Sequence, residues 1–355
     1  MTFSEIYEEL ICFRNLEQNE FGKKQESHGF ENIQYNEWHC MFCGGSHPKA
    51  KFTKKAHAIS ETIGNKRLFN YLECQECNLY FGKAFEDSLG KYTAPFRFVS
   101  HIFGKKNTVT IKDMPEPQSE ISYKSYRMEI KKRTSDAQST SPFSSSDYLI
   151  ERSGRGIVER TKDGFSLNIP RDPYNPRLVY AAFLKMAYSI LPWSMAPGYL
   201  HCIVMLRQYA AAAPPFDDTA EADRYLSGMP CKGFFNFLPG INPFGGVNAY
   251  LYRKHLLSDS SYCSLLFRID FYNFSITVPV LSDKEFCGVG DHSFHMLSPY
   301  KSGVSDVIDF TKEERNFRCE FSALEIPIDS SQYETIAAEL REQGLLRLKS
   351  EESNI

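Results

Sequence analysis

Two Cys-x-x-Cys pairs occur in the first quarter of the 355-residue chain, Cys40 with Cys43 and Cys74 with Cys77. Each pair offers two thiolates from one tight turn, and two such pairs are the usual ligand set of a tetrahedral structural zinc. The alternative is a chance arrangement among the ten cysteines of the chain, but the repeated spacing favours zinc. We therefore predict that Cys40, Cys43, Cys74 and Cys77 hold a structural Zn²⁺.

A histidine and several asparagines lie between and beside these pairs. Hydrolysis of a phosphodiester needs a base that activates water and a cation that stabilises the charge on the phosphate. A neutral imidazole is a suitable base near pH 7, and an amide oxygen suits Mg²⁺ or Mn²⁺. The pattern places His57 on a strand, Asn70 before the second cysteine pair, and Asn78 at the start of a helix. This set could form a compact unit around one cation.

Each of these residues also has a purely structural interpretation. Taken alone, His57 is better explained as a buried, hydrogen-bonded histidine of the core than as a base. Asn78 could cap the helix that follows the cysteines, because asparagine is a favourable N-cap. The catalytic interpretation therefore depends on the surrounding frame.

That frame closely resembles the bacterial HNH endonucleases of the zinc-knuckle type, which have a ββα-metal active site. The resemblance covers residues 40–82, a small part of the chain. It is carried by three motifs in the same order: Cys40-x-x-Cys43-Gly, then Ala56-His57-Ala-Ile-Ser-Glu-Thr-Ile-Gly64-Asn65, then Glu73-Cys74-x-x-Cys77-Asn78-x-x-Phe81-Gly82.

The resemblance implies a role for each candidate residue. His57 corresponds to the general base that activates water. A middle asparagine orients that histidine, and Asn70 is at the better distance, with Asn65 as its rival. Asn78 corresponds to the ligand of the catalytic divalent cation, Mg²⁺ or Mn²⁺.

One position departs from the family pattern. Many relatives carry an acid or a second histidine immediately before the base as another metal ligand, whereas this chain has Ala56. The cation would then depend on Asn78, the substrate phosphate and water, or on another side chain such as His47 or Glu61.

Positive charge is concentrated between the two cysteine pairs. The whole chain has a formal net charge of -3, but the segment from Lys49 to Arg67 contains six Lys or Arg residues and a single acid, Glu61. Such a segment suits a phosphate backbone. A solvated lysine-rich loop is the alternative. The candidate nucleic-acid contacts are Lys51, Lys54, Lys55, Lys66 and Arg67.

Composition indicates a globular protein of a reducing compartment. The remaining cysteines are scattered singly, several in apolar surroundings, which argues against a disulfide framework. The acidic N-terminal segment lacks the features of a signal peptide, and no apolar run approaches the length of a membrane span. The expectation is a cytoplasmic protein without a membrane partner.

We predict an α+β fold in which an N-terminal zinc-stapled ββα-metal module precedes a larger mixed α/β C-terminal domain. Residues 1–35 would form a helix and a connection, and residues 36–95 the HNH module. Residues 96–146 would be a β-rich connector ending in a serine-rich linker. Residues 147–355 would form the mixed domain, with a sensing or partner-binding role.

Several elements can be placed within these ranges. The helix after Cys77 is expected to end at Gly90, with a strand over 96–99. A helix should start at Asn175-Pro176 and continue to Ile190. Residues 265–280 suggest one long or two paired strands, and 333–340 a final helix.

The leading functional hypothesis is a divalent-metal-dependent DNA endonuclease that nicks or cuts by one-metal water attack. The alternative is a catalytically inactive zinc module that binds nucleic acid or a protein. By analogy with other HNH fusions, we hypothesise a bacterial anti-phage role, with a protein or nucleotide regulator acting through the C-terminal domain. Since one site cuts one strand, a homodimer is a further expectation.

Overall fold

The structure of the chain is a computed structural model. The described residues are 2–16, 38–100, 102, 111–112, 119–124, 127–132, 158–161, 164–212, 226, 228–238, 243–255, 261–287, 294–295, 297, 299–300, 304–314 and 316–322. The chain divides into two compact units, one of residues 1–146 with 169–317 and one of residues 147–168 with 318–355.

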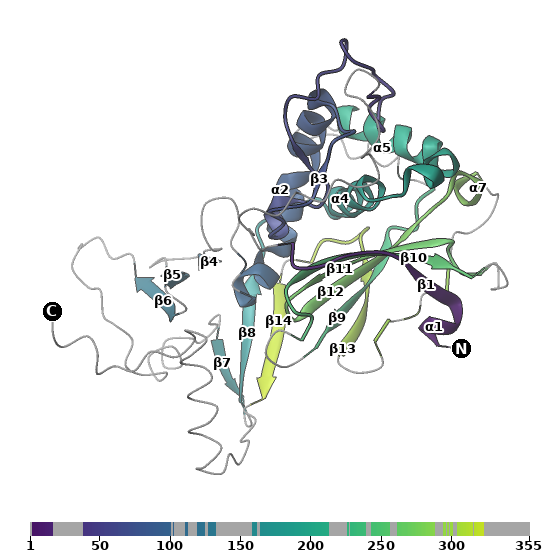
Figure 1. The fold of residues 1–355 in the computed structure, drawn as a ribbon. Helices are drawn as coiled ribbons and strands as arrows, with labels where there is room; N and C mark the ends of the chain where they lie inside the picture. Colours follow the sequence, from purple (N-terminus) through teal and green to yellow (C-terminus); the bar gives the residue numbers. More distant parts are fainter. Residues whose placement is uncertain are drawn as a thin grey trace. The chain divides into compact units, whose positions relative to one another are not determined.

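A six-stranded antiparallel sheet is the largest element of the first unit (Figure 1). Its strand order is β1-β10-β11-β12-β9-β13. The bounds are β1 Tyr7–Phe13, β9 Lys232–Phe237, β10 Val247–Lys254, β11 Leu265–Phe271, β12 Phe274–Val280 and β13 Val304–Asp309.

The centre of this sheet is the hairpin β11–β12, which settles the prediction for 265–280 in favour of two paired strands. Leu265 pairs with Val280 at one end and Phe271 with Phe274 at the other. Every residue of both strands is buried. Alternate side chains point to opposite faces, so one face carries the large apolar residues and the other carries Arg268 and Asp270.

Three helices lie on the apolar side of the sheet (Figure 1). They are α2 Gln75–Val99, α4 Pro176–Ser189 and α5 Leu200–Ala212, with the 3₁₀ segment η3 Trp193–Tyr199 before α5. Helices α2 and α4 lie against the strands, and α5 packs on α2 and α4. The predicted start of α4 is confirmed, because Asn175 Oδ1 accepts hydrogen bonds from Arg177 N and Leu178 N. Ile190 follows as the C-terminal cap.

Helix α2 is longer than the sequence indicated. It does not end at Gly90 but continues through Pro95 to Val99, so the strand predicted over 96–99 is wrong. The physical reason is tertiary packing, which outweighs the local helix-breaking signals. The ring of Phe96 packs against those of Phe274 and Phe317, with centroids 5.1 and 4.9 Å away, and this requires the helical continuation.

The N-terminal segment also differs from its prediction. A single helical turn, α1 Phe3–Ile6, is followed by β1, which pairs with β10 at the edge of the sheet. The pairing register shifts between Glu9 and Ile11. A bulge of this kind adds a residue to one strand and interrupts its two-residue alternation, so the apolar spacing imitated a helix.

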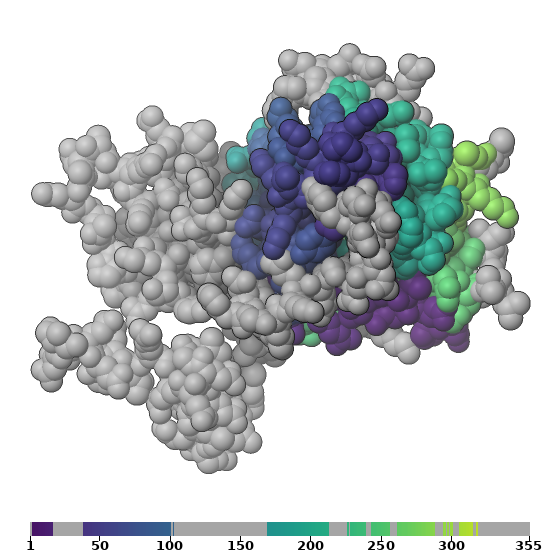
Figure 2. Space-filling model, turned by 45° about the horizontal axis from the view of Figure 1, so that its top comes forward, coloured from purple at the N-terminus to yellow at the C-terminus, as the bar shows by residue number. Residues whose placement is uncertain are grey.

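The compact units do not follow the predicted domain ranges. The zinc-binding segment and the large sheet belong to one unit, because α2 packs on α4 and α5 and the N-terminal strand pairs with β10. In Figure 2, residues 38–100 in dark blue and helices α4 and α5 in teal form a continuous surface. A boundary at residue 146 therefore does not separate the site from the sheet.

The smaller elements complete the described part. One three-stranded sheet contains β4 Ile111–Lys112, β5 Ser119–Lys124 and β6 Arg127–Lys132, and another has the order β14-β8-β7, with β7 Val158–Thr161, β8 Gly164–Pro170 and β14 Asn316–Ser322. Among the described residues, no helix combines the length and apolar character needed to cross a membrane. The predicted serine-rich linker and the helix over 333–340 lie outside the described residues.

The packing of α2 predicts a large effect of Phe96→Ala. Phe96 is 1% exposed, and its loss leaves a cavity between α2 and the sheet. We expect the free energy of unfolding to fall by about 3–5 kcal/mol, measured by chemical denaturation. Leu79→Ala is the control on the same helix, since Leu79 is 54% exposed. Equal effects of the two substitutions would contradict the assigned packing.

Candidate active site

The four predicted zinc ligands converge. Their Sγ atoms all lie within 4.8 Å of one another. The Sγ–Sγ distance is 3.7 Å between Cys40 and Cys77 and 3.8 Å between Cys43 and Cys74. A tetrahedral zinc with Zn–S bonds of about 2.3 Å separates its sulfurs by about 3.8 Å. The cluster therefore fits a structural zinc.

Backbone amides surround these sulfurs and would stabilise their thiolate forms. Cys74 N lies 3.4 Å from Cys40 Sγ, and Cys77 N lies 3.5 Å from Cys74 Sγ. In the first pair, Gly45 N lies 3.4 Å from Cys43 Sγ. Gly44 has a φ of 67°, a left-handed conformation that glycine adopts at little cost, and this closes the first turn. N–H groups that point at ligand atoms orient them for the metal.

The cysteine cluster joins the three elements of a ββα unit. Strands β2 Ala56–His57 and β3 Phe69–Asn70 pair antiparallel, with Ala56 opposite Asn70 and His57 opposite Phe69. Helix α2 begins immediately after Cys74, which is its N-cap. The second cysteine pair thus fixes the first turn of α2 beside the two short strands, and Asn78 comes one turn into the helix.

Of the two candidate asparagines, Asn65 is the one that lies at His57. Its Nδ2 is 3.4 Å from His57 Nδ1 and donates to the carbonyl oxygens of Ile59 at 2.6 Å and Leu68 at 2.8 Å. Its Oδ1 accepts from Leu68 N at 2.9 Å and from Arg67 N. The fully buried side chain therefore fixes the loop between β2 and β3.

Asn70 does not reach the histidine through any contact seen here. Its Nδ2 lies 3.1 Å from Met41 Sδ, and its Oδ1 accepts from Leu72 N at 3.0 Å. These contacts tie β3 to the turn of the first cysteine pair. Asn65 rather than Asn70 thus lies beside His57, a placement that spacing along the chain did not reveal because it depends on how the loop folds back.

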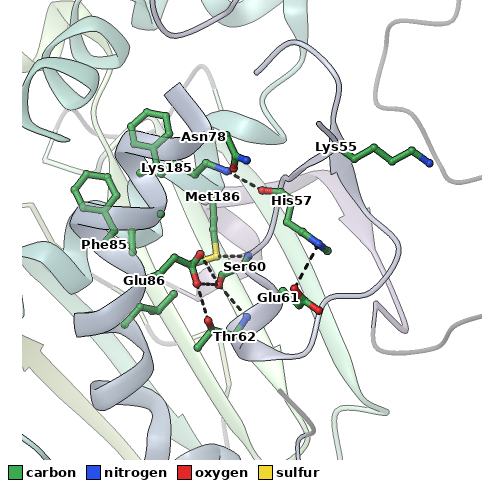
Figure 3. A pocket seen from close by; sticks show the side chains of 14 residues that line it. Lys55, His57, Ser60, Glu61, Thr62, Asn78, Phe85, Glu86, Lys185 and Met186 are labelled. Atoms are coloured by element: carbon green, nitrogen blue, oxygen red, sulfur yellow. Dashed lines mark hydrogen bonds and ion pairs between the residues drawn. The ribbon is translucent and has the colours of Figure 1, made fainter. Parts of the chain in front are cut away.

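A pocket of about 500 Å³ opens beside His57 (Figure 3). His57, Glu61 and Asn78 line it together, so the predicted base and the predicted metal ligand share one cavity. The other lining residues are Lys55, Ser60, Thr62, Phe81, Gly82, Phe85, Glu86, Leu89, Ala182, Lys185 and Met186. His47 does not line this pocket, and Ala56 is fully buried with no ligand atom in its side chain. Glu61 is therefore the better placed of the two additional ligand candidates.

The pKa of His57 is set first by burial and then by neighbouring charges, of which Glu61 and Lys185 are the foremost. Burial lowers the pKa of His57 below its ordinary value, the carboxylate of Glu61 opposes this, and the ammonium of Lys185 reinforces it. The distance from His57 Nε2 to Glu61 Oε2 is 3.8 Å. A lowered pKa keeps the imidazole neutral near pH 7, which is the form that accepts a proton.

Two acidic residues that the sequence analysis did not single out organise the walls of the pocket. Glu86 on α2 accepts hydrogen bonds from Ser60 Oγ at 2.8 Å and Thr62 Oγ1 at 2.6 Å, which anchors η2 Glu61–Ile63 to the helix (Figure 3). Glu73, buried before Cys74, forms an ion pair with Lys185 at 2.8 Å. The available signal was Lys185 itself, the one charged residue of α4 beyond Arg177 in its first turn.

Two of the predicted nucleic-acid residues, Lys55 and Lys66, are in or next to the pocket. Lys55 lines the pocket, and its ammonium points outward in Figure 3. Lys51 and Lys54 are exposed. Lys66 forms an ion pair with Glu61 at 3.3 Å and is only half-buried, as is Arg67. Lys55 is thus the candidate phosphate contact closest to the proposed chemistry.

Comparison with known proteins identifies part of the chain. Residues 40–93 match a family model described as HNH endonuclease. This agrees with the resemblance of the sequence motifs and indicates nuclease activity in general terms. No curated protein and no solved structure matches the chain.

The cysteine geometry predicts that the protein holds about one zinc per chain. Cys74→Ser should abolish stoichiometric zinc and lower the thermal unfolding temperature, because binding and folding of such a site are coupled. Metal analysis by mass spectrometry measures the first effect. Cys287→Ser is the control, since Cys287 is exposed at the end of α7 Asp283–Phe286. Undiminished zinc in Cys74→Ser would contradict the assignment.

The electrostatics predict a further fall in the pKa of His57 in Glu61→Gln. The wild-type carboxylate favours the imidazolium, so its removal favours the neutral ring. Titration of the His57 ring resonances by NMR measures the shift. Glu8→Gln provides the control, because Glu8 pairs with Arg253 at the edge of the sheet. A rise in the pKa of His57 would show that Glu61 does not act as described.

Proposed function

We propose that this protein is a divalent-metal-dependent DNA endonuclease in which His57 is the general base. The observation that carries the proposal is the shared pocket of His57 and Asn78 on a ββα frame joined by four cysteines. The family match over residues 40–93 supports the same reaction class. The proposed reaction is hydrolysis of a DNA phosphodiester by water in this pocket.

His57 would take the proton from the attacking water through Nε2. This nitrogen is the one directed towards Glu61 in the pocket (Figure 3). The other ring nitrogen, Nδ1, faces the buried amide of Asn65. Once the ring is protonated, the nearby carboxylate of Glu61 would stabilise the imidazolium. The base and its stabilising charge therefore come from the same short segment after β2.

Asn65 would act as a positioning residue. Both of its amide hydrogens are used by the carbonyl oxygens of Ile59 and Leu68, so its 3.4 Å approach to Nδ1 is a packing contact rather than a strong hydrogen bond. On the other side, the ring of His57 packs on Phe69 with centroids 4.7 Å apart. The imidazole is thereby restricted to an orientation that presents Nε2 to the pocket.

Asn78 is the proposed protein ligand of the catalytic cation, with Glu61 as the second candidate. A bound Mg²⁺ or Mn²⁺ would supply charge stabilisation for the phosphate and the leaving oxygen. An amide oxygen and a carboxylate are suitable donors for either ion. With alanine at position 56, few protein ligands are available, so we expect weak binding of the ion before DNA binds.

The alternative is an inactive zinc module that binds nucleic acid or a protein. Ala56 is the observation that favours it, because a fully buried methyl group offers no ligand. An active endonuclease would in turn need control, since unrestrained cleavage would damage the DNA of its own cell. This consideration supports the hypothesis of a defence role with a trigger.

A plasmid-cleavage assay separates the two functions. We expect wild-type protein to nick or cut supercoiled DNA with Mg²⁺ or Mn²⁺, and His57→Ala to be at least about 100-fold slower. Asn78→Ala should also be slower, and part of its loss should be recovered at higher metal concentration. His201→Ala, an exposed histidine on α5, is the matched control. Equal cleavage by His57→Ala and wild type would overturn the assignment of the base.

A further inference from the structure

One wall of the pocket comes from outside the segment that matches the nuclease family. Ala182, Lys185 and Met186 on α4 line the cavity, although the family match ends at residue 93. Met186 also contacts the loop of the site, because Ser60 N lies 3.4 Å from its Sδ. The candidate active site is therefore completed by a helix that covers the sheet.

Lys185 makes the closest contacts between this helix and the ββα unit. Its Nζ lies 2.8 Å from Glu73 Oε2 and donates to the backbone carbonyl of His57 at 2.7 Å. The ring of Phe81 is 5.9 Å from the ammonium. The side chain of Lys185 is 11% exposed and that of Glu73 is 0% exposed. A single ammonium thus joins the strand of the base to the residue before the second cysteine pair.

The pair is not explained by stability. Removing two charges from water is costly, and apolar residues of similar size often stabilise a core equally well or better. The residues on either side of Lys185 in the chain, Leu184 and Met186, are buried and apolar, so such a replacement would suit them. The desolvation cost makes the charge of Lys185 a candidate for a role in the site.

The geometry leaves a place for an anion. An ammonium has three N–H groups. One donates to the His57 carbonyl, and the 2.8 Å ion pair with Glu73 occupies a second side of the ammonium. Lys185 lines the same cavity as His57 and Asn78, and Figure 3 shows it directed into the site with its bond to the His57 carbonyl. An anion bound beside the imidazole could accept the remaining N–H.

We propose that Lys185 is a component of the nuclease site that fixes the His57 strand through its carbonyl and donates its third N–H to a non-bridging oxygen of the scissile phosphate. The inference rests on the proposed endonuclease function. Lys185 keeps its proton throughout, and the proton of the attacking water goes to His57. The ammonium stabilises the negative charge of the phosphate oxygens during attack, a contribution of the kind that preorganised charges make in phosphoryl transfer.

The test compares full-length wild-type protein with full-length variants. Lys185→Met alone would leave the carboxylate of Glu73 buried without its partner, so the main variant is Lys185→Met with Glu73→Gln. Glu73→Gln alone is the reference, because it keeps the ammonium. Lys83→Met is the matched control, since Lys83 is an exposed lysine on α2. Zinc content and thermal unfolding are measured first, then DNA binding and the cleavage rate of bound DNA.

We expect the double variant to retain its zinc and to bind DNA within about threefold of Glu73→Gln, yet to cleave bound DNA about 100-fold more slowly. Lys83→Met should match wild type. A folded double variant that cleaves as fast as Glu73→Gln would overturn the proposal. If the double variant does not fold, the cleavage rate of Lys185→Gln is measured instead. The glutamine amide can still donate to the His57 carbonyl but carries no charge. Cleavage at the wild-type rate by folded Lys185→Gln would also refute a role for the charge.

The outcomes also separate this inference from the function on which it rests. If wild type and His57→Ala both leave DNA intact, the endonuclease proposal fails. If wild type cleaves and His57→Ala does not, but the double variant still cleaves at the rate of Glu73→Gln, only the role of Lys185 is refuted.

Discussion

The proposed chemistry depends on how two very short strands are held in place. Strands β2 and β3 contain two residues each, far too few to be stable alone. The four-cysteine cluster ties the segments before and after them to the start of α2, and Asn65 ties the loop between them through backbone hydrogen bonds. The ion pair of Glu73 and Lys185 attaches the same strands to α4. Position in this site is therefore imposed from outside the strands.

This dependence explains the arrangement of polar groups around the pocket. Glu86 holds the turn after β2 through two hydroxyl groups, and Glu61 is left facing the imidazole of His57. The carboxylates of Glu86 and Glu61 line the same cavity but differ in their partners. One is occupied by hydrogen bonds from the loop, whereas the other lies against a titratable ring and the ammonium of Lys66. The surrounding contacts, rather than residue type, separate a structural acid from one that can act on the base.

Much of the site could be predicted from the sequence because its information is local. Two cysteine pairs at this spacing predicted the convergence of four thiols, and the motifs between and around them predicted the resemblance that the family match supports. The choice between Asn65 and Asn70 could not be made in this way, since it depends on how the loop folds back onto His57. The contribution of Lys185 to the pocket could not be predicted from the sequence for a similar reason. This residue is far from the motif in sequence and reaches the site only through the packing of α4 on α2.

The fold shows the same division between local and tertiary signals. The N-cap of α4 and the β11–β12 hairpin were predictable from residues that are adjacent in sequence. The length of α2 was not, because Gly90 and Pro95 would end many helices, and the aromatic residues that favour continuation come from β9, β11 and β12. In β1, a bulge interrupts the alternation that is typical of a strand, so the strand is recognised only from its pairing with β10.

Helix α2 is continuous, with its N-terminal end in the pocket and its C-terminal end in the core, so a change of tilt at one end displaces the other. Asn78 and Phe96 are on the same rod, separated by about 27 Å at 1.5 Å per residue. A tilt of about 5° about the Phe96 end would displace Asn78 by about 2 Å, while a misplacement of about 1 Å can already reduce catalysis by two orders of magnitude. The aromatic packing at the far end of the helix therefore contributes, together with the cysteine cluster, to the position of the proposed cation ligand Asn78.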